Sequence, residues 1–388
     1  MLNVRKLEES RPGVLLAQHR GTLLIRLRIA PAIVIFAASL GAAARSEAQD
    51  PSALANAGTA AIEAGRFGEA VEAFTRAAEV RPGDANLCFG AGVAAFMLGR
   101  DDVAQSRFEC ALALNPDFLS ASVWLADLHY QAGRLAEAIA TYEAALQRCP
   151  ENRGLQQKID DWRKQQELLS RFHEARSEHF TAVFEVATDE PLARRATERL
   201  ETAYRRIGKT LGVYPSKRIT VVLYTREQFT DITGLTAWSA AAYDGLIRLP
   251  LAEALEQTDE LDRVLSHELV HAVVNMLGGR TVPAWVSEGL ATVLEPAGSQ
   301  DAEAALTRTD VRPSLSALPR GFVGLSKQDA EIAYATSARA VRRLIEQRGV
   351  DTVVALLADL GRGAPFDRAF QQRTAMRYED FAALVARD

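Results

Sequence analysis

A pair of histidines that flank a glutamate gives this sequence its clearest capacity for chemistry. The run at residues 266–271 reads SHELVH and lies within a pattern of helical period over residues 259–277, which ends at a pair of glycines. Histidines four residues apart share one face of a helix, so His267 and His271 can bind one metal ion. Glu268 lies beside them, where it can take a proton from water. The pattern H-E-x-x-H therefore predicts one Zn²⁺ ion, two of its ligands and a general base.

A catalytic zinc ion needs a third protein ligand and one open position for water. No histidine follows His271 anywhere in the chain, which leaves a carboxylate for this role. Residues 283–291 read PAWVSEGLA and begin a new helix after a short glycine-rich turn, and they place Glu288 seventeen residues after His271. We expect this helix to fold back across the first and to bring Glu288 to the ion. The alternative is a helix with polar core residues, which would be costly if they were unpaired.

Two further features are candidates for handling a substrate. Tyr334 lies in a helix expected over residues 330–347, and it is our candidate for stabilising the oxyanion that forms when water attacks a carbonyl. The alternative is that its ring only packs between helices. Residues 243–249 are a candidate edge strand that pairs with an extended substrate, and an ordinary core strand is the alternative there.

A small sheet with helices is expected ahead of the histidines. Residues 179–187 alternate apolar and polar side chains, which is typical of a half-buried strand. Residues 218–224 read RITVVLY and predict a second strand, and residues 245–249 predict a shorter third. An amphipathic helix over residues 190–211, ended by Gly212, connects the first two strands. The part of the chain that positions the histidines is therefore expected to be α+β.

A period of 34 residues organises the sequence over residues 51–152. Glycines, arginines and prolines recur at this interval, and alanines and aromatic residues keep the same register. Glycine allows a tight turn after a helix, and proline prevents a second helix from continuing. The pattern predicts three units of two helices each. The recurring residues are Gly65, Gly99 and Gly133; Arg66, Arg100 and Arg134; Pro82, Pro116 and Pro150; Ala70, Ala104 and Ala138; and Phe74, Phe108 and Tyr142.

These recurring positions resemble the tetratricopeptide repeat. The resemblance implies an all-α superhelix whose groove binds a peptide or a partner protein. The alternative is that the array only braces the domain that follows it. Residues 153–176 are polar and helix-prone, and we expect them to cap the array and to link it to a domain over residues 177–388.

The segments HELVH and PAWVSEGLA together are similar to the gluzincins, and within them to the peptidase MA-like domains. That family carries H-E-x-x-H followed by P-x-W-x-x-E-G-x-A, and the likeness extends over residues 177–370. The resemblance implies an α+β zincin-like fold and a zinc-dependent peptidase. It agrees with the assignment of His267, His271 and Glu288 as ligands and of Glu268 as the base. Tandem repeats ahead of such a peptidase domain form the predicted multidomain architecture.

The first 48 residues have the pattern of an export signal. Several arginines lead into an apolar run at residues 29–44, which small residues follow. We expect a cleaved signal peptide and hence a periplasmic or extracellular protein, and the alternative is an uncleaved membrane anchor at residues 23–44. The 48 residues carry seven Lys or Arg and three Asp or Glu, so their removal changes the net charge from −5 to −9. Such an acidic protein is a poor partner for nucleic acid.

The three cysteines, Cys88, Cys110 and Cys149, all lie in the repeats. An odd number cannot form a complete set of disulfides. We expect small buried side chains rather than a bridge between Cys88 and Cys110.

The favoured function is hydrolysis of peptide bonds outside the cytoplasm, with repeats that recruit a substrate or a protein partner. One alternative is an adaptor in which the repeats act and the metallopeptidase-like domain is catalytically silent. The presence of both histidines and both glutamates argues against this alternative. Another is a zinc hydrolase that acts on a non-peptide amide, which the sequence leaves open.

Overall fold

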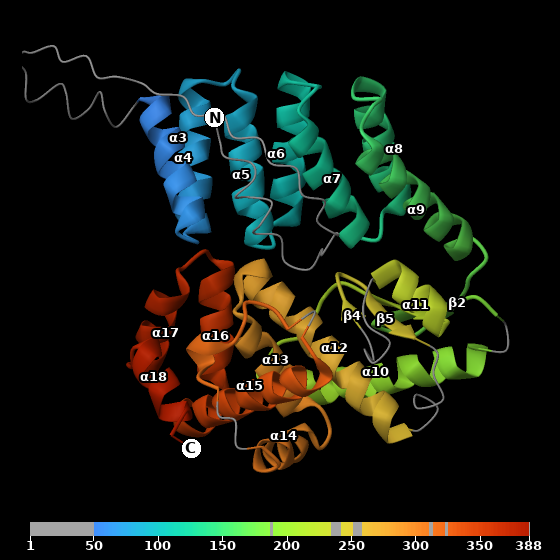
Figure 1. Cartoon of the computed structure of the whole chain (residues 1–388), viewed down its shortest axis with the longest axis vertical. Coiled ribbons are helices and arrows are strands. Elements are labelled where there is room, and N and C mark those ends of the chain that lie inside the picture. The colour runs from blue at the N-terminus through green and yellow to red at the C-terminus, as the bar shows by residue number, and fades with distance from the viewer. Residues whose placement is uncertain are drawn as a thin grey trace, which may run out of the picture.

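The computed structural model describes residues 50–186, 189–233, 242–250, 258–309, 313–322 and 325–387. The predicted signal peptide or anchor, residues 1–48, lies outside these ranges. Within them, no helix combines the length and the hydropathy that crossing a bilayer requires. The chain forms a stack of helices, followed by a second unit in which helices surround a small sheet (Figure 1).

Three helix pairs form the stack and follow the 34-residue period of the sequence. The turns within the pairs are made by Gly65, Gly99 and Gly133, each with a positive φ of 70–74°. Other residues adopt this conformation only with strain. The pairs are α3 (Pro51–Glu63) with α4 (Phe67–Val80), α5 (Ala85–Met97) with α6 (Asp101–Leu114), and α7 (Leu119–Gln131) with α8 (Leu135–Arg148).

Aromatic rings between small residues hold each pair together. Phe74 and Phe108 are fully buried at equivalent positions of the first two pairs. A Cβ atom on Gly58 would lie 2.8 Å from the ring of Phe74, and one on Gly92 would lie 2.7 Å from the ring of Phe108. Because a close-packed core has no room for these extra atoms, the small residues are needed where the helices approach the rings.

The helix α9 (Arg153–Leu169) follows the third pair and buries Leu155, Ile159 and Trp162 against it. The next element, β1 (His173–Arg176), already belongs to the sheet. The segment predicted to cap and link the array, residues 153–176, therefore also contributes an edge strand.

The expectation of three unlinked cysteines is wrong for Cys88 and Cys110. These two residues form a disulfide between α5 and α6, and their Cα atoms lie 6.0 Å apart. The cause is that the two helices of one repeat pack face to face, so residues 22 apart in the sequence become neighbours. Cys149 is free and partly buried.

The sheet has the strand order β1-β2-β3-β5-β4. Its three central strands are parallel, and β1 and β4 are antiparallel to their neighbours. The remaining strands are β2 (Phe180–Phe184), β3 (Ile219–Tyr224), β4 (Ala242–Tyr243) and β5 (Ile247–Pro250).

The candidate edge strand over residues 243–249 needs correction. Most of it lies in β5, which is hydrogen-bonded on both sides, to β3 and to β4. Ile247 and Leu249 are completely buried, as in an ordinary core strand. Among the residues described, the short β4 is the edge strand next to β5. The chain reverses between β4 and β5 at Gly245, whose φ of 107° suits a residue without a Cβ atom.

Helices cover both faces of the sheet. Val221 and Leu223 of β3 lie in the main core with α10 (Glu190–Leu211) and α12 (Thr258–Gly278). Their neighbours Val222 and Tyr224 pack instead with Phe229 of α11 (Arg226–Thr233) and with the end of α9. This alternation follows from the two-residue period of a strand. The later helices are α13 (Ala284–Leu294), α14 (Gly298–Thr307), α15 (Lys327–Arg348), α16 (Val350–Gly361), α17 (Phe366–Thr374) and α18 (Tyr378–Val385), with short turns η3 (Gly279–Thr281) and η4 (Leu315–Ala317).

Candidate metal centre

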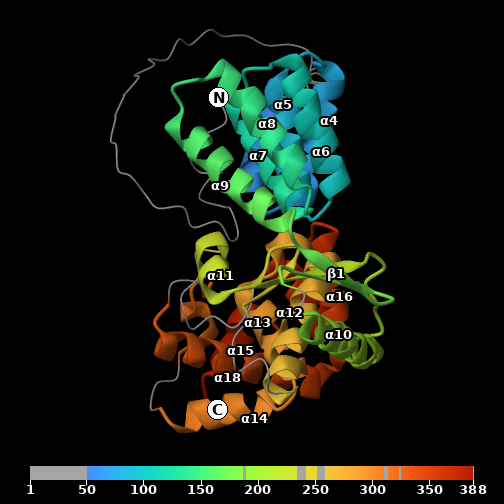
Figure 2. The same cartoon turned by 90° about the vertical axis from the view of Figure 1, so that its right-hand side faces the viewer.

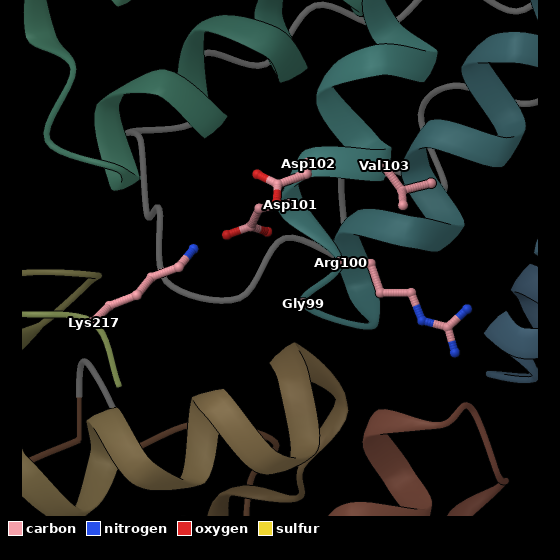
Figure 3. A pocket seen from close by; sticks show the side chains of 6 residues that line it. All are labelled: Gly99, Arg100, Asp101, Asp102, Val103 and Lys217. Atoms are coloured by element: carbon pink, nitrogen blue, oxygen red, sulfur yellow. The ribbon is translucent and has the colours of Figure 1, made fainter. Parts of the chain in front are cut away.

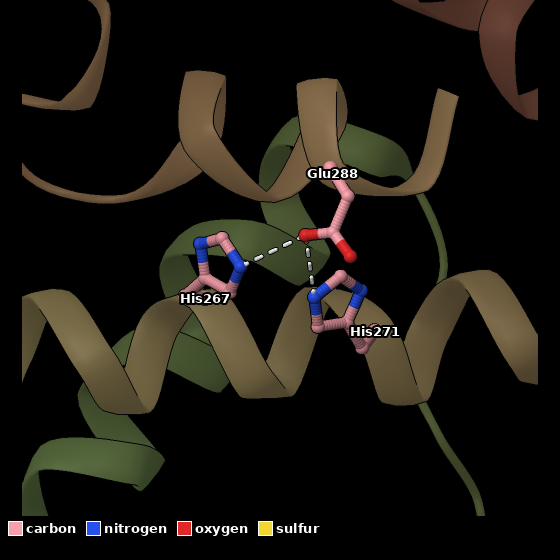
Figure 4. A group of neighbouring side chains, drawn as sticks. All are labelled: His267, His271 and Glu288. Atoms are coloured by element: carbon pink, nitrogen blue, oxygen red, sulfur yellow. Dashed lines mark hydrogen bonds and ion pairs between the residues drawn. The ribbon is translucent and has the colours of Figure 1, made fainter. Parts of the chain in front are cut away.

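The helices α12 and α13 bring the predicted ligands together. His267 and His271 lie on α12, and Glu288 lies on α13. The Nε2 atoms of His267 and His271 lie 3.3 and 3.2 Å from one oxygen, Oε2 of Glu288 (Figure 4). The ligand atoms of the three partly buried side chains lie within 4.8 Å of one another. Two imidazoles and one carboxylate therefore meet at one point.

The reversal between the two helices has a local cause. α12 ends at Gly278, and Gly279 begins the turn η3 with a φ of 66°. Glycine adopts this conformation without the strain that a Cβ atom causes. Pro283 lies immediately before α13, where a missing backbone N–H leaves no helical hydrogen bond unmade.

Close packing of α13 on α15 fixes the position of Glu288 relative to the two histidines. The next residue, Gly289, faces the backbone of α15, and a Cβ atom there would lie 2.3 Å from the carbonyl oxygen of Ser337. Any larger residue would push α13 away from α15 and carry Glu288 with it. The glycine of the segment EGLA thus has a structural role beside the ligand.

Two side chains that the sequence did not identify orient the imidazoles. Nδ1 of His267 lies 2.8 Å from Oε2 of Glu295, and Nδ1 of His271 lies 2.9 Å from Oγ of Ser287. A histidine that donates from Nδ1 presents the lone pair of Nε2 to a metal, so such partners select the binding tautomer. Glu295 lies seven residues after Glu288, about two helical turns further along, and this spacing is the only feature of the sequence that points to Glu295. No feature of the sequence points to Ser287.

Glu268 is buried and lacks a hydrogen-bond partner for one oxygen. Its Oε2 atom contacts no donor among the residues described, and the side chain is 6 % exposed. Burial raises the pKa of Glu268, while the nearby His271 and His267 lower it. A buried oxygen without a donor is costly, which indicates a missing partner such as water.

The ligand cluster is strongly polarised. Burial alone would lower the pKa of His267, but its hydrogen bonds to Glu288 and Glu295 and their negative charges raise it to about 10. Burial raises the pKa of Glu288, but the charge of His271 and the hydrogen bonds to both histidines hold it well below its usual range. Without a metal, the site thus holds a proton on His267 where a cation could sit.

Tyr334 of α15 lies beside this cluster. Its ring centroid is 6.1 Å from that of His267 and 5.4 Å from that of Phe322, with edge-to-face geometry in both cases. Burial raises the pKa of Tyr334, and the charges of three nearby glutamates raise it further. The phenol is therefore neutral at physiological pH and can donate a hydrogen bond. Its ring also packs as the alternative interpretation expects.

The donor set and its spacing fit a zinc ion. Ligands about 2.0–2.1 Å from a tetrahedral ion stand about 3.4 Å from each other. The separations of 3.3 and 3.2 Å between the two nitrogens and the Glu288 oxygen are close to this value. Three protein ligands would leave one position on the ion for water, and the nearby Glu268 has an oxygen with no hydrogen-bond partner among the residues described.

The fold and the site together define a class: a helical-repeat protein that carries an α+β zincin-like domain. A family model described as tetratricopeptide repeat matches residues 37–85, 55–104 and 102–153, and one described as Peptidase MA superfamily matches residues 202–382. The chain thus has tetratricopeptide repeats at its N-terminal side and a Peptidase MA superfamily domain in its C-terminal half.

Similar solved structures concern the repeats. The first tetratricopeptide domain of Spaghetti (RPAP3), bound to an HSP90 peptide, is 24 % identical over 31 % of this chain and 97 % of its own, with a TM-score of 0.29. MamA is 20 % identical over 33 % of this chain and 75 % of its own, with a TM-score of 0.31. No curated protein matches the chain.

Proposed function

We propose that the second unit is a zinc-dependent peptidase of the gluzincin type. The observation that carries the proposal is the convergence of three ligand atoms beside the buried Glu268, one oxygen of which has no hydrogen-bond partner among the residues described. A simple buried ion pair would account for the ligand atoms alone. A buried ion pair would not explain why the Nδ1 atoms of both imidazoles have hydrogen-bond partners, nor why Glu268 is buried beside them.

His267, His271 and Glu288 would hold one Zn²⁺ ion, which when bound supplies a Lewis acid that acidifies water and polarises a carbonyl. Glu268 accepts a proton from the attacking water and passes it to the leaving amine. Its raised pKa suits this exchange, because a more basic carboxylate takes the proton more readily. The neutral Tyr334 phenol donates to the oxyanion that forms on the substrate. Among the residues described, the short β4 ends the sheet on this side, and its edge would pair with an extended peptide.

We further propose that the repeats bind a peptide or a protein partner, because this is the general use of grooves in such arrays. Residues 1–48 would direct the protein to the periplasm or the extracellular space. The membrane would be a partner only if this segment stayed attached.

The test compares wild type with Glu268→Gln, using zinc quantification and cleavage of casein or a peptide library. We expect one zinc ion in both proteins and a loss of turnover of about 100- to 10,000-fold in the variant, as for removal of a general base. Glu346→Gln is a matched control, because this glutamate is 66 % exposed and lies at the far end of α15. His271→Ala should lose the ion.

Equal cleavage by wild type and Glu268→Gln would refute the assigned base. Full zinc occupancy in His271→Ala would refute the ligand set. Stoichiometric zinc without cleavage of any peptide by the wild type would instead favour the adaptor or a non-peptide substrate.

A further inference from the structure

The turn ends of the three helix pairs rest on three loops of the second unit (Figures 1 and 2). Each loop meets the array through a glycine with positive φ. A Cβ atom on any of these glycines would collide with the array, so the backbones approach more closely than other residues allow. The added Cβ atom would lie 2.7 Å from Gly68 of the first pair for Gly363, 2.6 Å from Leu98 of the second for Gly279, and 2.1 Å from Gln131 of the third for Gly245.

Beside the middle contact, Arg280 anchors the second unit to two repeats. Its guanidinium donates to Asp101 of α6 at 2.6 and 3.2 Å, and to the carbonyl oxygen of Phe96 at 2.9 Å. It also donates to the side chain of Gln131 of α7 at 2.9 and 3.2 Å and lies 4.0 Å from the centre of the Phe96 ring. The Arg280 side chain is only 10 % exposed. A planar group with this many partners has one orientation.

A cleft of about 280 Å³ opens beside this anchor, lined by Gly99, Arg100, Asp101, Asp102, Val103 and Lys217. Figure 3 shows Lys217 reaching toward Asp101 and Asp102, while the side chain of Arg100 points away from these three residues. Asp101 keeps 44 % of its side chain exposed, so water can reach one side of its pair with Arg280. We therefore expect the chain to remain folded when Asp101 is substituted.

Arg280 lies in η3, the connection between the two helices that bear the metal ligands. It follows His271 by nine residues and precedes Glu288 by eight. A displacement of η3 would change how α12 and α13 lie against each other, and with them the distances between the imidazoles and the carboxylate. A metal site tolerates errors of only about 0.5 Å in its ligands.

We propose that Arg280 is a positioning residue of the metal centre, a role that rests on the zinc site proposed above. By anchoring η3 to the second and third repeats, it holds α12 and α13 at the separation that the ligands require. The array thus forms part of the scaffold of the peptidase unit, in addition to any partner that it binds.

The test compares the full-length wild type with Arg280→Ala, Arg280→Lys and Asp101→Asn. Arg100→Ala is the matched control, because Arg100 is in the same interface but bonds the carbonyl oxygen of Arg362, a residue outside η3. The zinc dissociation constant is measured by competition with a chromophoric chelator, and the visible spectrum of the Co²⁺-loaded protein reports the ligand geometry. Thermal unfolding checks that each variant is folded.

We expect Arg280→Ala to raise the zinc dissociation constant at least about 10-fold, the usual effect of losing a residue that orients ligands. Arg280→Lys should have a smaller effect of the same sign, since lysine keeps the charge but not the planar set of donors. Asp101→Asn should also weaken zinc binding, and Arg280→Lys and Asp101→Asn should both alter the Co²⁺ spectrum. If Arg280→Ala does not fold, the results for Arg280→Lys and Asp101→Asn decide.

Wild-type zinc affinity and an unchanged Co²⁺ spectrum in every folded Arg280 and Asp101 variant would overturn the proposal and leave the zinc site intact. An equal loss in Arg100→Ala would also overturn it, because the effect would then belong to the whole interface. A wild type that binds no zinc would overturn both the proposed function and this role.

Discussion

At the residue scale, one oxygen of Glu288 is shared by two imidazoles whose other nitrogens are already engaged. Glu295 holds His267 and is itself 3.6 Å from the guanidinium of Arg263, so the polar chain extends beyond the ligands. Partners of this kind raise the basicity of a ligand and fix its orientation. The same carboxylates attract a proton to His267 when no cation is bound.

This competition predicts how zinc binding depends on pH. The pKa of His267 is raised to about 10 in the metal-free protein, so at pH 7.5 the ring is protonated and zinc must displace one proton. Zinc affinity should therefore rise about tenfold for each pH unit between pH 7 and 9. Calorimetry in two buffers of different ionisation enthalpy should detect one released proton.

The metal-free protein should show the opposite trend in stability. A histidine with a pKa raised by folding contributes stability below the unfolded value of 6.5, and this contribution is lost as the pH rises toward 10.

A zinc affinity that stays constant from pH 7 to 9 would contradict the predicted proton on His267.

At the element scale, the site depends on how α13 lies against its neighbours. α13 reaches α12 through Glu288 and α15 through Gly289, and these residues are adjacent. A ligand and a close helix contact on successive residues leave the helix little freedom to shift. The order Glu-Gly in the segment EGLA expresses this constraint.

Gly289→Ala should therefore destabilise the protein. Alanine normally favours a helix over glycine by roughly 0.5–1 kcal/mol, so any loss must come from the collision with Ser337. We expect a decrease of about 1–3 kcal/mol in the free energy of unfolding, typical of overpacking. Urea unfolding of the metal-free protein measures it.

Gly321→Ala is the control, because a Cβ atom there has no neighbour within 4 Å in the part of the chain that the structure describes. If both substitutions have the same small effect, the contact between α13 and α15 does not limit the position of Glu288.

At the scale of the whole molecule, the array and the sheet share a buried arginine. Arg248 of β5 is 1 % exposed and bonds Asp244 at 3.0 Å, the hydroxyl of Tyr224 at 2.9 Å and the hydroxyl of Tyr130, on α7, at 3.5 Å. Burial opposes its charge, but Asp244 raises the pKa of Arg248 above its usual value. A charge buried at a junction is tolerated only where all its partners are in place.

Arg248→Met should weaken this junction. Loss of a partner from a buried polar network costs about 3–5 kcal/mol, and the apolar replacement offsets part of it, so we expect a net loss of about 2–3 kcal/mol. Differential scanning calorimetry should show one transition for the wild type and a lower or divided one for the variant. The control is Arg320→Met, at an exposed position. A single unchanged transition in Arg248→Met would contradict this role for Arg248.

The sequence alone was sufficient for features that depend on short, regular spacings. The 34-residue period predicted the helix pairs and their turns, because each repeat folds largely through contacts within itself and with its neighbours. The spacing of His267 and His271 on one helix, and the later segment with Glu288, identified the candidate ligands because a helix places residues four apart on one face.

The tertiary structure decided what no local period encodes. It placed Glu295 and Ser287 behind the imidazoles, β1 and β4 at the sides of the sheet, and Cys88 beside Cys110. It also set the array on the loop of Arg280, which lies 179 residues after Asp101. Such contacts join segments far apart in the chain, and their geometry follows from the packing of whole helices rather than from the propensity of any one segment.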